Sequence, residues 1–149
     1  MKRIITAALA LLLCCAGAHA QLNVKSASAG PVKIAAGTQS VGLLLYTQEA
    51  GYLMYLKSSN RYDKSGYFLL GKELDGAIQT LADLRELCDT IGANIVTVES
   101  WPGRSCTILA SDRPGFLRLK FNRNAGDCEL GAKDIDIYYD ALVEKKGQE

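Results

Sequence analysis

The sequence predicts an α+β fold in which short antiparallel strands alternate with two amphipathic helices. Two segments have the three-to-four-residue apolar spacing of a helix, and each follows a group of strand-like runs separated by turn residues. Apolar residues make up 48% of the 149 residues, which is enough for a hydrophobic core. We therefore expect the order βββα-βββα, with both helices packed on one face of an antiparallel sheet.

Three strands are predicted before the first helix. They cover residues 40–48, 52–58 and 67–71, and turn-forming residues lie between them. Residues 21–37 are rich in Ala, Ser and Gly and are expected to form a flexible lead-in, with a short edge strand at residues 32–35. The three main strands would form a meander.

The first helix is predicted over residues 74–91. Asp75 is expected to cap its start, and Gly92 is expected to supply the left-handed residue that ends many helices. The apolar residues that define its buried face are Leu74, Ile78, Leu81, Leu84, Cys88 and Ile91.

Strand periodicity returns after Gly92. Strands are predicted over residues 94–100, 105–110 and 116–122, followed by a polar loop and a second helix over residues 133–146. In the last strand, apolar and basic residues alternate, so one face of its sheet should contact water. The similar order of the two halves suggests a weak internal duplication.

The start of the chain has the pattern of a secretory signal peptide. Basic residues precede the apolar run 4–13, and Ala18-His19-Ala20 forms a small-x-small cleavage site before Gln21. We therefore expect a signal peptide at residues 1–20 and a single α+β domain at residues 38–149, exported to the periplasm or the extracellular space. Cleavage would remove the only histidine, which excludes histidine-based catalysis and histidine-bound zinc.

An alternative leader is that of a lipoprotein anchored through Cys14 or Cys15. Such leaders place a small residue just before the modified cysteine, whereas Leu13 precedes Cys14 and Cys14 precedes Cys15. Simple cleavage after Ala20 is therefore the favoured expectation.

Three cysteines follow the leader. Cys88 falls on the apolar face of the first helix, whereas Cys106 opens a strand and Cys128 falls in a predicted polar loop. In an oxidising compartment, this arrangement predicts a Cys106–Cys128 disulfide and one remaining thiol. The alternative is three free thiols.

Charge and motifs exclude several function classes. Without the leader, 15 basic side chains face 16 acidic ones, and this net charge of −1 argues against a nucleic-acid partner. After residue 20, no apolar run approaches the roughly 20 residues that cross a bilayer, so no transmembrane segment is expected in the mature chain. The sequence contains no phosphate-binding loop, nucleophile motif or Cys-x-x-Cys, and no cofactor is expected.

The leading expectation is a small non-enzymatic binding or interaction domain. Tyrosines are concentrated in the first meander, and their rings combine an apolar surface with a polar tip that suits a protein or glycan partner. Tyr55 and Tyr62 are the candidate contact residues there, and Trp101 is a third candidate in a predicted turn.

The rival expectation is a hydrolase or lyase that uses only carboxylates. Its candidate residues are Asp127, Asp134 and Asp136, since paired carboxylates can act as general acid and base. A calcium loop starting at Asn122 is not expected, because its twelfth position is Lys133 where a bidentate glutamate is needed. No metal site is expected.

Overall fold

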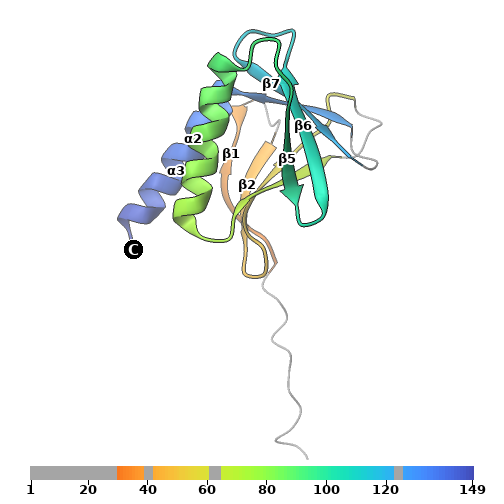
Figure 1. The fold of residues 1–149 in the computed structure, drawn as a ribbon. Coiled ribbons are helices and arrows are strands. Elements are labelled where there is room, and N and C mark those ends of the chain that lie inside the picture. The colour runs from red at the N-terminus through yellow and green to blue at the C-terminus, as the bar shows by residue number, and fades with distance from the viewer. Residues whose placement is uncertain (1–29, 39–41, 61–64, 123–125) are drawn as a thin grey trace, which may run out of the picture.

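Two four-stranded antiparallel sheets and two helices form the fold in the computed structural model of the protein (Figure 1). The structure describes residues 30–38, 42–60, 65–122 and 126–149. One sheet has the order β1-β2-β3-β4 and the other the order β5-β6-β7-β8. The elements are β1 (Val32–Ala36), β2 (Gly42–Thr47), β3 (Gly51–Leu56), β4 (Gly66–Gly71), α2 (Leu74–Thr90), β5 (Val96–Trp101), β6 (Arg104–Ala110), β7 (Phe116–Phe121), β8 (Asp127–Gly131) and α3 (Ala132–Gly147).

The predicted α+β class and its antiparallel sheets are confirmed, and each half has one strand more than the main prediction. Strand β1 is the edge strand expected within the lead-in, and it pairs with β2. Strand β8 was missed, because only Cys128 and Leu130 give its five residues an apolar face. The observed order is therefore ββββα-ββββα, which gives the two halves the same topology.

The expected cap at the start of α2 is wrong, and the expected left-handed residue after its end is confirmed. Glu73, not Asp75, is the residue before the first helical turn, and no side chain caps it. Asp75 lies inside the helix and instead forms an ion pair with Lys146 of α3, at 2.6 Å. Gly92 has a φ of +50°, which is the left-handed conformation predicted after the helix end.

Helices α2 and α3 lie side by side (Figure 1). Helix α2 packs mainly against β4, whereas α3 packs against β1 and β8 and so contacts both sheets. Across the described part of the chain, neither helix has both the length and the apolar character needed to span a membrane.

One hydrophobic core is shared by both sheets and both helices. In the second sheet, Leu117 and Leu119 of β7 are fully buried and Lys120 is exposed, which confirms the predicted alternation. The largest fully buried side chains, drawn from every layer, include Leu44, Met54, Leu56, Leu81, Ile108, Leu119, Leu130, Ile135, Tyr138 and Leu142.

The chain after β3 joins the two sheets. Ser58 forms a bridge with Cys128 of β8, and the Ser59 amide donates to the Asp127 carbonyl oxygen at 2.9 Å. Nearby, Gly66 packs against the Phe121 ring so closely that a Cβ atom there would overlap it. This junction brings the end of β3 next to the strand that leads into α3.

The expected Cys106–Cys128 disulfide is not formed, and Cys88, Cys106 and Cys128 are free thiols. Cys128 is a fully buried residue of β8, not part of a polar loop. Strand β7 lies between β6 and β8, so two strand spacings, about 10 Å, separate the backbones of the two cysteines. A disulfide requires Cα atoms closer than about 7 Å.

We predict that the protein loses stability above pH 9 because its thiols are buried. Burial raises the pKa of Cys106 to about 12 and those of Cys88 and Cys128 to about 11, from a usual value near 9. The stability contributed by the neutral thiols is therefore present below pH 9 and is lost as the pH rises through 11 to 12. Urea unfolding at pH 8 and pH 10 should show a smaller free energy of unfolding at pH 10.

The Cys106→Ala variant is the control, because it removes one of these titrations. Its stability at pH 8 will be lower, but its further loss between pH 8 and pH 10 should be smaller than that of the wild type. Equal losses in the two proteins would contradict the assignment to buried thiols.

Candidate binding cleft

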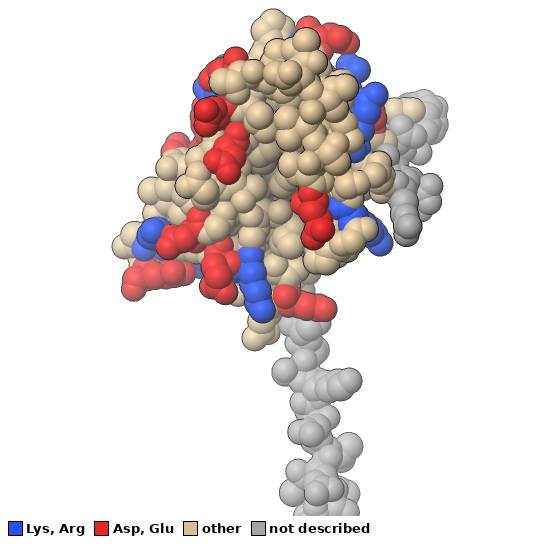
Figure 2. Space-filling model, in the orientation of Figure 1, with Lys and Arg blue, Asp and Glu red and all other residues tan. Residues whose placement is uncertain are grey.

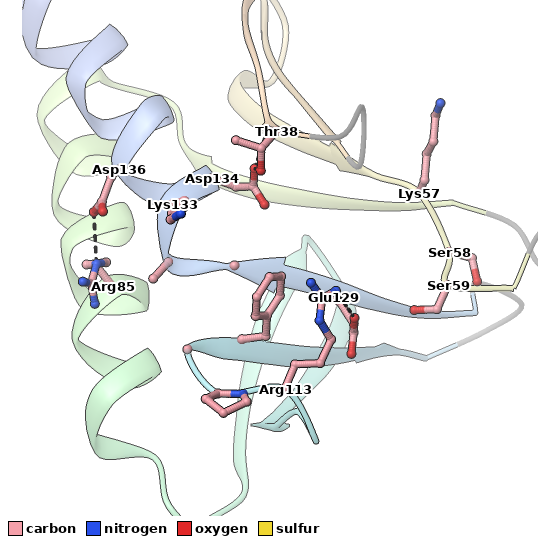
Figure 3. A pocket seen from close by; sticks show the side chains of 15 residues that line it. Thr38, Lys57, Ser58, Ser59, Arg85, Arg113, Glu129, Lys133, Asp134 and Asp136 are labelled. Atoms are coloured by element: carbon pink, nitrogen blue, oxygen red, sulfur yellow. Dashed lines mark hydrogen bonds and ion pairs between the residues drawn. The ribbon is translucent and has the colours of Figure 1, made fainter.

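An open cleft of about 980 Å³ lies where the two sheets meet the start of α3 (Figure 3). Its residues come from segments that are far apart in the sequence. They include Thr38 after β1, Lys57, Ser58 and Ser59 after β3, Arg85 of α2, Arg113 and Phe116 around the start of β7, Glu129 of β8, and Lys133, Asp134 and Asp136 of α3.

Asp134 connects the segment after β1 to the first turn of α3 through hydrogen bonds. Its carboxylate is buried and accepts hydrogen bonds from the Thr38 amide at 2.6 Å and the Thr38 hydroxyl at 2.7 Å. The two side chains point toward one another in Figure 3. A negative charge in the first turn is also stabilised by the helix dipole.

Tyr138 lies one turn further along α3, beneath the same segment. Its hydroxyl is buried and has no hydrogen-bond partner among the described residues. The nearby Gly37 amide donates to the Gly42 carbonyl oxygen at 3.0 Å. Burial, with a further contribution from Asp134, raises the pKa of Tyr138 to about 12. A Cβ atom on Gly37 would lie 2.7 Å from this hydroxyl, so only glycine fits there.

The other two carboxylates that line the cleft are held by arginines. Arg85 donates through Nε to Asp136 at 3.0 Å and through Nη1 to Asp89 at 2.9 Å. Arg113 pairs with Glu129 at 3.1 Å, and its guanidinium lies 3.8 Å from the centre of the Phe116 ring. Each carboxylate of the cleft therefore has a cationic or hydrogen-bonding partner.

Lys57 and Lys133 are the basic residues of the cleft that form no ion pair within the described residues. Both are exposed. Lys133 belongs to the first turn of α3, whereas Lys57 stands on the other side of the view and extends outward from the rim (Figure 3). The cleft thus offers two separated cations to a ligand.

Two of the three candidate catalytic carboxylates, Asp134 and Asp136, line this cleft together. The third, Asp127, does not line it and lies 3.9 Å from Lys120 across β7 and β8. Asp134 is held by Thr38 and Asp136 by Arg85, so their observed partners give both a structural role. Over the described ranges, no three His, Cys, Asp or Glu side chains converge as metal ligands.

Tyr55 and Trp101, two of the three predicted aromatic contacts, do not line the cleft. Tyr55 is half-buried on β3, and its ring lies 5.1 Å from that of Tyr67, which is 50% exposed. Trp101 is half-buried at the end of β5, opposite Arg104. Tyr62 lies outside the described residues.

Most of the residues that line the cleft could not be predicted from the sequence. Lys57, Arg113, Phe116 and Lys133 belong to no motif, and their spacing along the chain carries no signal for a shared site. The signal that was present is the acidic start of the second helix, which led to Asp134 and Asp136.

Comparisons of the chain with protein-family models, curated proteins and solved structures gave no significant match.

We predict that Asp134→Asn lowers the free energy of unfolding by about 1–3 kcal/mol, because it weakens two hydrogen bonds at a buried site. Asp136→Asn is the matched control on the same helix turn. Its carboxylate is 55% exposed, and the loss of its ion pair should cost about 0.5 kcal/mol or less. Urea denaturation measures the free energy of unfolding of both variants. Equal losses would contradict a stabilising role for the hydrogen bonds between Thr38 and Asp134.

Proposed function

We propose that this protein is an exported, non-enzymatic binding domain whose cleft binds an extended acidic segment of a partner protein. The observation that carries this proposal is the charge arrangement of the cleft. Its three carboxylates each have a cationic or hydrogen-bonding partner, whereas Lys57 and Lys133 form no ion pair with the residues that the structure describes.

The electrostatics of the cleft favour an anionic ligand. Four basic and three acidic side chains line it, and the start of α3 adds the partial positive charge of a helix N-terminus. Carboxylates of a ligand can contact both lysines only if the ligand extends across the cleft. A flexible acidic peptide segment meets that requirement.

The surroundings of Phe116 favour a polypeptide over a glycan in this cleft. A sugar ring commonly binds by packing its apolar face on an exposed aromatic ring. The guanidinium of Arg113 already lies over the Phe116 ring, at 3.8 Å from its centre. Backbone and carboxylate groups of a peptide can instead pair with Lys57, Lys133 and the neighbouring hydroxyl groups.

We predict that a fluorescein-labelled decapeptide of glutamate binds the full chain, as measured by fluorescence anisotropy, and that a lysine decapeptide does not. The double variant Lys57→Glu/Lys133→Glu should weaken the affinity by roughly tenfold or more, since two favourable charge contacts become repulsive. Added salt should weaken binding as well.

Lys72→Glu is the control for a single charge reversal, because Lys72 is an exposed lysine between β4 and α2 that does not line the cleft. It should change the affinity by no more than about twofold, as expected for a distant surface charge. Equal weakening by the control and the double variant, or no binding of the acidic peptide, would overturn the assignment of the cleft. Binding of neutral oligosaccharides in its place would favour the glycan alternative.

Export is the second part of the proposal, and it rests on the leader pattern of residues 1–20. We predict that the protein expressed with its own leader is recovered with the intact mass of residues 21–149 and with three reduced thiols. Mass spectrometry before and after thiol alkylation measures both properties. A product that starts at Cys14 or Cys15 and carries acyl chains would instead establish a lipid anchor.

A further inference from the structure

A second hollow, of about 410 Å³, lies between α2 and α3. Ala82, Ile135 and Tyr139 provide its apolar surface, and Glu86, Asp89 and Asp136 provide its carboxylates. The Arg85–Asp136 ion pair lines both this groove and the cleft described above, so the two hollows are neighbours.

Apolar side chains are exposed along α3 beside this groove. Tyr139 is 37% exposed, and Val143, one helical turn further on, is 44% exposed. Residues four positions apart lie on the same side of a helix, so these two side chains form one stripe. Exposed apolar residues in a stripe at the edge of a groove are typical of a surface that another helix covers.

The charge around the groove is strongly acidic. Glu86 and Asp89 line it from α2 and Asp136 lines it from α3, and the exposed Asp140 lies one turn after Asp136. Arg85 is the cation lining the groove, and both Asp89 and Asp136 already bind it. Figure 2 shows acidic side chains over the helix pair, with basic side chains among them toward its lower end.

We infer that the groove between α2 and α3 is a docking site for a basic amphipathic helix of a partner protein. The apolar side of that helix would cover Tyr139 and Val143, and its lysines or arginines would pair with carboxylates such as Glu86 and Asp140. Both components are needed, because the apolar stripe is narrow and the surrounding carboxylates attract a basic helix and repel an acidic one. The site differs in place and in charge preference from the proposed cleft, and it does not depend on ligand binding there.

The length of the helix pair defines the probe. Helix α2 has 17 residues and spans about 25 Å, so a partner helix of similar length can follow the groove. The probe is a synthetic 18-residue amphipathic peptide of leucine and lysine, titrated into the full chain with calorimetry and amide NMR. We expect binding, with amide shifts concentrated in residues 82–89 and 135–143. A leucine–glutamate peptide of the same pattern should not bind.

Three variants separate specific docking from general attraction between charges. Glu86→Lys/Asp140→Lys should lower the affinity for the leucine–lysine peptide at least tenfold, and Tyr139→Ser should lower it at least fivefold. Glu99→Lys reverses one charge on the exposed side of β5, as each single substitution of the double variant does in the groove, and it should have less than a twofold effect. Circular dichroism checks that each variant remains folded, and the amide spectrum of the free protein provides a second check.

The inference is overturned if the leucine–lysine peptide does not bind, if Tyr139→Ser leaves its affinity unchanged, or if Glu99→Lys weakens it as much as the double variant. Shifts concentrated around Lys57 and Lys133 would also overturn it. The double variant of the proposed cleft, Lys57→Glu/Lys133→Glu, should not lower the affinity for this peptide. Each of the two proposals can therefore be contradicted without the other.

Discussion

The burial of both sheets in one core is the constraint on which the structure depends. Each half of the chain is a four-stranded meander followed by a helix, and each meander has an apolar face that its own helix does not fully cover. Helix α3 contacts β1 as well as β8, so the helix of the second half also covers the first sheet. Each half therefore completes the core of the other, and burial of apolar area is the dominant favourable contribution to that association.

This constraint also builds the cleft. Because the chain after β3 bridges to β8, Lys57, Ser58 and Ser59 are placed beside the strand that leads into α3. Asp134 then holds Thr38 against the first turn of that helix. The cleft is consequently a product of the junction between the halves.

The two surfaces proposed for binding have opposite charge preferences and share one ion pair. Arg85 reaches from α2 to Asp136 on α3, and this contact lies between the two exposed lysines of the cleft and the carboxylates along the helix pair. A chain with nearly balanced charge can therefore present two locally charged surfaces. Overall net charge conceals this division, because it averages over the whole chain.

The sequence by itself determined the α+β class and the places of most elements, because their signals are local. Apolar spacing located α2 and α3, the alternation in residues 116–121 defined β7, and Gly92 marked a helix end. Strand β8 was missed because it is five residues long and its formation depends on pairing with β7. Only the tertiary structure decided the state of the cysteines and the composition of the cleft. Strand order separates Cys106 from Cys128, and Thr38, Lys57, Arg113 and Asp134 meet only when the two halves pack together.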